Sequence, residues 1–200
     1  MIKRKQGENE ALEILENIGI EMDEEYTDDN SRPKMPDLRY KDGRFIEVTH
    51  TRYNVEFIQR LRNHGCKAVG DDKVFLNEEC HQSDCPIIKQ CTDAILREII
   101  DDKGKKYPYG DTDLFLFVTT EEYRNMLNLM PQWKWNGEAN IFLYDIEKSP
   151  FQTIYVCEWD FENLIYNTVD PKMTRFYRND GTLQWQYYRH KELFCEKVVQ

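Results

Sequence analysis

The sequence predicts a mixed α/β (α+β) domain in which helices flank one central sheet. Three patterns predict it: an amphipathic helix near the N-terminus, a glycine-containing turn between two strand patterns at residues 35–51, and a continuous apolar run within residues 113–120. Such a run is typical of a strand that is buried on both faces. A chain of 200 residues, 40% of them hydrophobic, suits a single domain with a substantial core.

Residues 7–19 predict the first helix. Its expected apolar face consists of Ala11, Leu12, Ile14, Leu15 and Ile18. This spacing matches the period of an α-helix, and Gly19 favours an end of the helix at that point. The acidic and polar residues that follow, up to Arg32, predict a loop or a weak strand.

Strand patterns at residues 35–40 and 45–51 predict a hairpin, because Lys41-Asp42-Gly43 between them is typical of a tight turn. The rest of the chain predicts, in order, helices at 54–63 and 84–101, a strand at 113–120, a helix at 121–129, strands at 139–145 and 153–158, and a hairpin of 173–178 and 183–188 around Asn179-Asp180-Gly181. We expect residues 1–150 to form the core and residues 151–200 to form an aromatic, β-rich C-terminal extension of the same domain.

The net charge of −10 argues against a protein that coats nucleic acid by general attraction, because phosphate would repel it. An enzyme that approaches phosphate through metal ions is compatible with this charge. The chain has no run of about 18 apolar residues and no signal-peptide core, so the sequence predicts a cytoplasmic protein with no membrane association.

The six cysteines fit free thiols in a cytosolic protein better than disulfides. Cys80, His81, Cys85 and Cys91 lie close together, with Cys66 nearby. Their gaps of four and five intervening residues differ from the closely paired cysteines that are typical of structural zinc. The pattern favours half-buried thiols near the start of a helix, and a zinc or iron–sulfur site is the alternative.

The predicted hairpin carries two carboxylates that its register can oppose. If the turn has three residues with Gly43 in the left-handed conformation, Tyr40 pairs with Arg44 and Asp37 faces Glu47. Directly opposed Cβ atoms lie about 4.5–5.5 Å apart, where two carboxylates repel each other and a divalent cation would offset the repulsion. A two-residue turn would place the two acids on opposite faces, so this prediction depends on the register.

Two further features favour a functional site over acids that merely cap a turn or face water. Glu47 lies within the apolar stretch Phe45-Ile46-Glu47-Val48, and Thr49 shares its face under either register because side chains alternate along a strand. Glu8 precedes Leu12 and Leu15 by four and seven residues, which places it on the apolar side of the first helix. The other glutamates of that helix are expected to face solvent: Glu10, Glu13 and Glu16.

This combination of motifs resembles the PD-(D/E)XK nuclease superfamily, which has the restriction-endonuclease-like fold. The core of that family is a helix bearing a glutamate, then a hairpin bearing Pro-Asp and, some ten residues on, Asp/Glu-X-Lys. Glu8 resembles the helix glutamate, Pro36-Asp37 resembles the PD, and Glu47-Val48-Thr49 occupies the (D/E)XK position. The hairpin is also similar to that of the cap-snatching endonucleases of segmented RNA viruses. The motifs cover residues 7–65, and the element order extends the resemblance to about residue 120.

The resemblance implies a divalent-metal-dependent nuclease that hydrolyses phosphodiester bonds in DNA or RNA. It implies Mg²⁺ or Mn²⁺ held by Asp37, Glu47 and the Val48 carbonyl, with Glu8 binding the ion directly or through water. Such an ion polarises the phosphate and lowers the pKa of a water molecule. A homodimer or a larger complex is left open.

Thr49 departs from the family pattern, which has a lysine there that activates water and stabilises developing charge. Threonine carries no charge and would at most hydrogen-bond the attacking water. Some family members place the basic residue on the next helix, so Arg62 or Arg60 is a candidate here, with Lys34 and His50 as weaker ones. The alternatives are a restriction-like module that has lost catalysis and binds nucleic acid or a regulatory partner, and an unrelated acidic protein that binds another protein.

Residues 172–191 reverse the acidic balance of the chain, because basic side chains stand there against Asp180 alone, and Phe, Tyr and Trp are interleaved with them. A strand platform of this kind suits stacking on single-stranded bases. The alternative is an aromatic hairpin that packs on the sheet. The basic residues are Lys172, Arg175, Arg178, Arg189 and Lys191.

Overall fold

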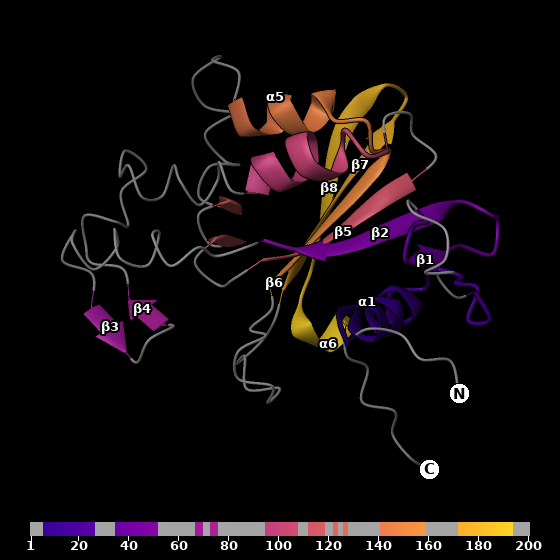
Figure 1. The fold of residues 1–200 in the computed structure, drawn as a ribbon, viewed down its shortest axis with the longest axis horizontal. Helices are drawn as coiled ribbons and strands as arrows, with labels where there is room; N and C mark the ends of the chain where they lie inside the picture. The colour runs from indigo at the N-terminus through magenta and orange to yellow at the C-terminus, as the bar shows by residue number, and fades with distance from the viewer. Residues whose placement is uncertain are drawn as a thin grey trace, which may run out of the picture.

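The computed structural model describes residues 6–26, 35–51, 67–69, 73–75, 95–107, 112–118, 122–123, 126–127, 141–158 and 172–193. Within these ranges the chain is an α+β structure built around a six-stranded mixed sheet (Figure 1). Its elements are α1 (Gln6–Asn17), β1 (Leu38–Arg39), β2 (Phe45–His50), β3 (Lys67–Val69), β4 (Lys73–Phe75), the π-helical segment η2 (Arg97–Lys103), β5 (Thr112–Val118), α5 (Ile141–Lys148), β6 (Thr153–Glu158), β7 (Met173–Asn179), β8 (Thr182–Tyr188) and α6 (His190–Leu193).

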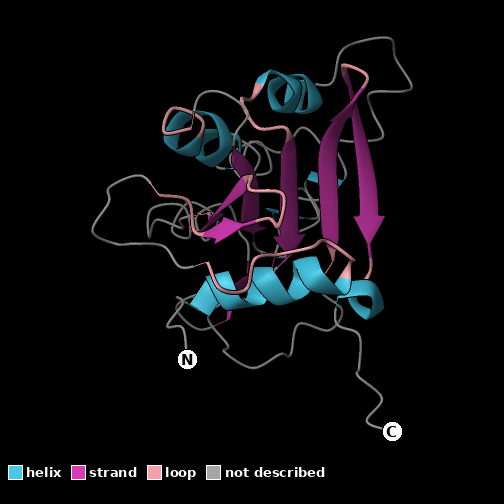
Figure 2. Ribbon diagram, turned by 90° about the vertical axis from the view of Figure 1, so that its right-hand side faces the viewer, coloured by secondary structure: helices cyan, strands magenta, loops and turns pink. Residues whose placement is uncertain are grey.

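The strand order in the large sheet is β1-β2-β5-β6-β7-β8, and β3 and β4 form a separate two-stranded sheet. The three central strands β2, β5 and β6 run parallel, and the outer neighbours pair antiparallel. In Figure 1, α1 and α6 lie on one side of the sheet, and η2 and α5 lie on the other. Figure 2 shows that the axis of α1 runs across the strands.

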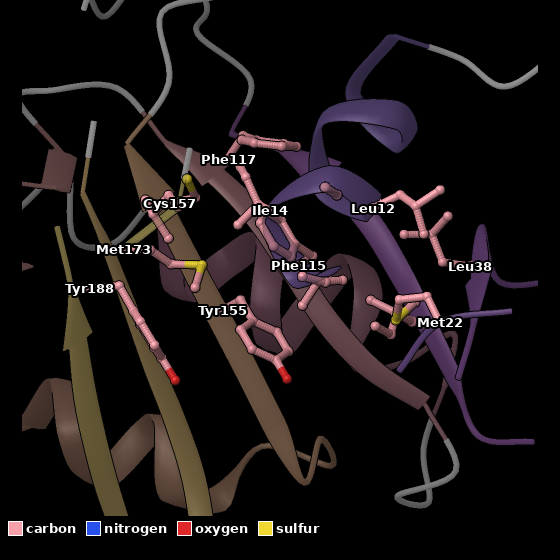
Figure 3. Close-up of a cluster of buried hydrophobic side chains, with 14 of the residues drawn as sticks. Leu12, Ile14, Met22, Leu38, Phe115, Phe117, Tyr155, Cys157, Met173 and Tyr188 are labelled. Carbon is pink, nitrogen blue, oxygen red and sulfur yellow. The ribbon is translucent and has the colours of Figure 1, made fainter. Parts of the chain in front are cut away.

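Each face of the sheet has its own hydrophobic cluster, because successive residues of a strand point to opposite faces. On β5, Phe115 and Phe117 pack with the α1 side, whereas Leu114 and Leu116 pack with the side of η2 and α5. Figure 3 shows Ile14 of α1 among the phenylalanines of the first cluster. Every residue of β5 is buried, which confirms the predicted central strand.

The first helix and both hairpins are confirmed. Gly19 has φ +83° and directly follows a helix end at which Ile20 N–H donates to Leu15 O at 2.9 Å, as in a Schellman cap. In the second hairpin Asn179 pairs with Thr182, which leaves a two-residue turn of Asp180 and Gly181 with φ 50° and 78°. Positive φ at both central positions is the type I′ geometry that such a sequence favours.

The predicted strand at residues 139–145 is wrong, because α5 occupies Ile141–Lys148. Aromatic and β-branched residues favoured a strand, but Leu143 and Ile146 are buried three positions apart on one helical face. The topology also demands a crossover here, since β5 and β6 are parallel neighbours and such strands are usually joined by a helix.

Other predictions are confirmed over part of their length or fall outside the described residues. The predicted helix at 84–101 is helical from Ile95 and continues to Lys103, and residues 122–123 and 126–127 of the predicted helix at 121–129 are helical. The predicted helix at 54–63 lies outside the described residues, as does the cysteine group of Cys66, Cys80, His81, Cys85 and Cys91. In the described part of the chain no helix has the length and apolar character needed to cross a membrane.

Candidate active site

The hairpin of β1 and β2 adopts the register that opposes the two predicted carboxylates. Leu38 pairs with Ile46 and Arg39 with Phe45, so the same register continued by one residue sets Asp37 opposite Glu47. The turn has three residues: Tyr40 N–H donates to Arg44 O at 2.9 Å, and Gly43 has φ +94°. A side chain at Gly43 would be strained at this φ, so the glycine fixes the turn length and thereby the register.

Asp37 is buried at the start of the hairpin and its carboxylate is directed at the backbone of β2. Its Oδ2 accepts a hydrogen bond from Val48 N–H at 2.8 Å. The Val48 side chain packs with the cluster on the α1 side, whereas Glu47 contacts Lys103 at the end of η2 and Tyr107 just after it, on the other side. The Asp37 carboxylate therefore lies beside the peptide bond that joins Glu47 to Val48, and Glu47 carries the second carboxylate.

Glu47 is a buried carboxylate, 3% exposed, whose two oxygens are held by charged and phenolic donors. Lys103 Nζ lies 2.6 Å from Oε1, Lys106 Nζ lies 3.3 Å from the same oxygen, and Tyr107 Oη donates to Oε2 at 2.7 Å. Burying a carboxylate is costly unless it is paired and hydrogen-bonded, and these three groups meet that requirement.

The π-helical turn of η2 helps to place these donors. Gly104 N–H donates to Ile99 O at 2.8 Å, five residues back, which widens the last turn of the helix. A Cβ at position 104 would lie 2.6 Å from Ile100 O, so only glycine fits this close approach. The widened turn contains Lys103 and directly precedes the segment with Lys106 and Tyr107, and all three residues contact Glu47.

Thr49, at the position of the family's lysine, is engaged elsewhere. Its Oγ1 donates to Glu98 Oε1 at 3.1 Å, and Glu98 is itself buried on η2. Two residues on, Thr51 Oγ1 donates to Glu122 Oε2 at 2.5 Å. The hydroxyls at this end of β2 thus bind buried glutamates, and the positive charge beside Glu47 comes from Lys103 and Lys106.

The structure does not bring all of the predicted ligands together. Glu8 is buried on α1, as predicted, but α1 packs on the face of the sheet opposite the lysines. Within the described ranges, no three His, Cys, Asp or Glu side chains form a group that could hold a metal ion. Arg60, Arg62 and Lys34 lie outside the described residues, and His50 is exposed at the end of β2.

Comparisons with protein-family models, with characterised proteins and with solved structures find no match.

Four residues of this site were missed by the sequence reasoning: Glu98, Lys103, Lys106 and Tyr107. A signal for three of them is present, since Lys103-Gly104-Lys105-Lys106-Tyr107 begins two residues after the end of the helix predicted at 84–101. The helical period does not show which of these lysines contacts Glu47. The choice depends on how this segment packs against β2, 56 residues earlier in the chain, and such packing is a tertiary feature.

The basic residues of the C-terminal hairpin pack against the protein at two positions. Arg178 donates to the carbonyl oxygens of Phe151, Ser149 and Glu147, at the end of α5. Arg175 lies over the rings of Tyr155 and Tyr177. Tyr187 on β8 is 40% exposed, so stacking of a base on this strand stays a prediction that depends on Tyr187 rather than on Arg178.

Proposed function

We propose that this chain is a divalent-metal-dependent nuclease that hydrolyses phosphodiester bonds in DNA or RNA, on a restriction-endonuclease-like core and in the cytoplasm. The observation that carries the proposal is the contact of Lys103 with Glu47, 2.6 Å from Nζ to Oε1. The resemblance demands a lysine beside the second acid, and the sequence has Thr49 where that lysine should be. Lys103 supplies the missing ammonium group from η2.

The arrangement of elements supports the same proposal. Among the described elements, a helix with a buried glutamate is followed by the acidic hairpin, then by the separate strands β3 and β4, then by η2, and then by β5, which pairs parallel to β2. This is the order that the resemblance implies. The hairpin register also supports it, because Asp37 and Glu47 are opposed across adjacent strands.

The donor chemistry around the hairpin fits a hard divalent ion. Asp37, Glu47 and the Val48 carbonyl offer only oxygen, which Mg²⁺ and Mn²⁺ prefer. Such an ion would compete with Lys103 and Lys106 for the Glu47 carboxylate. When bound, the ion supplies polarisation of the phosphate and a more acidic water.

The chain's own residues would then act on the phosphate as follows. Asp37 is fixed by Val48 N–H, and Tyr107 orients Glu47 through its hydroxyl. Lys103 and Lys106 place two ammonium groups where the negative charge of a phosphodiester develops, and preorganised charge of this kind is a large term in catalysis. Thr49 donates to Glu98 and would hold that carboxylate in place.

A second candidate is a restriction-like module that binds without cleaving. It is favoured by the state of Glu47, whose two oxygens already have an ammonium and a phenol at hydrogen-bond distance. Two lysines can neutralise the acidic pair without any ion. Both candidates share the fold and differ in metal binding and turnover.

The test is cleavage of end-labelled single- and double-stranded DNA and RNA with Mg²⁺ or Mn²⁺. Glu47→Gln and Lys103→Met should each lower the rate by about 10²–10³-fold, the usual loss on removing one charge-stabilising group. Lys105→Met is the matched control, since Lys105 is exposed and pairs with Asp101, and it should keep the wild-type rate. If folded wild-type protein cleaves none of the four substrates with either metal ion, the nuclease proposal is wrong and the binding module is the better explanation.

A further inference from the structure

A second polar site lies on the face of the sheet opposite Glu47. It is a cavity of about 230 Å³ at the turn end of the first hairpin, close to the starts of β5 and β6. Its polar walls include Tyr40, Arg44, Asp113, Thr153, Tyr155 and Arg175. Ile46 pairs with Asp113 and Glu47 pairs with Leu114, so the two sites occupy neighbouring rows of side chains that point to opposite faces.

Asp113 lines this cavity and both of its carboxylate oxygens accept hydrogen bonds from the protein. It is 2% exposed in a strand that is otherwise almost wholly apolar. Its Oδ2 accepts from Tyr40 Oη at 2.6 Å, and its Oδ1 accepts from Thr153 N–H at 2.9 Å. Arg44 Nη1 lies 3.4 Å from Oδ2. Because its oxygens are already occupied, Asp113 fixes the wall of the cavity and is a poor ligand for an added cation.

Arg175 presents a guanidinium group whose donors are not used up. The register of β6 and β7 pairs it with Tyr155, and its guanidinium lies 5.7 Å from the centre of that ring and 4.9 Å from the Tyr177 ring. Its Nε is buried and has no hydrogen-bond partner among the described residues. A buried N–H donor without a hydrogen-bond partner costs free energy, so an acceptor that entered the cavity would stabilise the protein.

Arg44 reaches the same cavity from the opposite side. Its Nε donates to Asp42 at 2.9 Å, its guanidinium lies over the Tyr40 ring, and its Nη1 contacts Asp113. Two planar guanidinium groups, each held over a phenol ring, thus converge on one cavity. Such groups match the geometry of carboxylate and phosphate oxygens.

We propose that this cavity binds a small oxyanion, a carboxylate or a phosphate group, held by Arg175 and Arg44. Drug-sized ligands occupy pockets of about 300–1,000 Å³, and this cavity of about 230 Å³ is smaller, so its size fits a small anion. In Figure 3 the hydroxyls of Tyr155 and Tyr188 lie at the same end of the buried cluster, and Arg175 hydrogen-bonds with Tyr188. Of these two phenols, Tyr155 lines the cavity itself and Tyr188 contacts Arg175.

Isothermal titration calorimetry of the full chain tests the proposal, with inorganic phosphate in one arm and malonate in the other, at an ionic strength held constant with sodium chloride. We expect saturable binding of at least one probe with a stoichiometry near one. Arg175→Gln should weaken it by about 10–100-fold, the equivalent of one charge-assisted hydrogen bond. Arg39→Gln, which changes an arginine stacked on Tyr26 outside the cavity, should bind as the wild type does.

Two further variants keep the result decisive. If Arg175→Gln fails to fold, Arg44→Gln replaces a half-exposed side chain and should weaken binding by about tenfold. Lys105→Met changes an exposed side chain outside both sites and should leave the affinity unchanged, so the outcome does not depend on the nuclease proposal. Absence of saturable binding, or equal affinity in wild type and folded Arg175→Gln or Arg44→Gln, would overturn the oxyanion site.

Discussion

Glu47 and Asp113 are two buried carboxylates in adjacent strands and adjacent rows, yet the protein satisfies them in different ways. Glu47 is held by the ammonium groups of Lys103 and Lys106 and by one phenol. Asp113 is held by the Tyr40 phenol and a backbone N–H, with one guanidinium farther away. The first carboxylate has its charge compensated by flexible cations, and the second relies mainly on neutral donors.

The difference shows which carboxylate can exchange its partners. Lys103 and Lys106 side chains are 18% and 33% exposed, and both lie on long flexible stems at the end of a helix. Under the proposed function, they would move aside when a metal ion or a phosphate binds. The Asp113 partners belong to a hairpin turn and to a strand backbone, so they are fixed by the fold. This difference is why we propose the nuclease site on the η2 side, whereas Asp113 forms part of the cavity wall on the other face.

Lys103→Met should give the largest loss of stability. It removes the closest cation from a Glu47 side chain that is 4% exposed. Breaking a buried pair costs about 3–5 kcal/mol, and we expect about 3 kcal/mol because Lys106 and Tyr107 stay in contact. Urea unfolding measures this value, and Lys105→Met should change it by no more than about 0.5 kcal/mol. Equal, small losses in both variants would show that the Glu47 pair is not stabilising.

Tyr40→Phe tests the neutral donors of Asp113. It removes the hydroxyl that donates to Oδ2 at 2.6 Å and leaves the ring in place. We expect a loss of about 1–3 kcal/mol in the free energy of unfolding, as for a buried acceptor that loses its partner. Tyr177→Phe is the control, since that hydroxyl makes only a 3.3 Å contact with Gln184 near the surface. A loss no larger than the control's would mean that the contacts with Thr153 and Arg44 are enough to stabilise the buried Asp113 carboxylate.

Lys106→Met should have a smaller effect than Lys103→Met. Its Nζ lies 3.3 Å from Glu47 Oε1 and its side chain is a third exposed, so solvent screens the pair. We expect a loss of about 0.5 kcal/mol in urea unfolding. If Lys106→Met cost more than Lys103→Met, the assignment of Lys103 as the main partner of Glu47 would be wrong.

The pH dependence of stability should differ in sign between Asp113 and Asp42, and this is the smallest effect we expect near neutral pH. Burial raises the pKa of Asp113 above its usual 3.8, so the folded state binds a proton more readily than the unfolded chain does. The contribution of Asp113 is therefore largest below pH 3.8 and is lost as the pH rises through the raised pKa. The Arg44 backbone N–H lowers the pKa of Asp42, so Asp42 contributes above its usual pKa and loses this contribution as the pH falls.

Urea titrations of wild type, Asp113→Asn and Asp42→Asn across acidic pH measure these contributions. The difference from wild type should change in opposite directions with pH for the two variants. A change in the same direction for both variants would show that burial does not govern the pKa of Asp113.

The hairpin and the candidate acids could be predicted from sequence because their determinants are local. Gly43 fixes the turn, the turn fixes the register, and the register opposes Asp37 and Glu47. Lys103 could not be chosen in this way, since its contact with Glu47 spans 56 residues and depends on the widened turn at Gly104. The misassigned α5 has the same cause: its helical state follows from the parallel pairing of β5 and β6, which no local pattern records.

The measurement that tests the account most directly is thermal melting of the full chain during titration with Mn²⁺. Wild type should melt about 3–6 °C higher at ten times the dissociation constant, because an ion that binds only the folded state stabilises it. Asp37→Asn and Glu47→Gln should abolish the rise, and Asp42→Asn, an exposed acid of the same hairpin, should retain it. No rise in the wild type at millimolar Mn²⁺, or an equal rise in all four proteins, would contradict a metal site at Asp37 and Glu47.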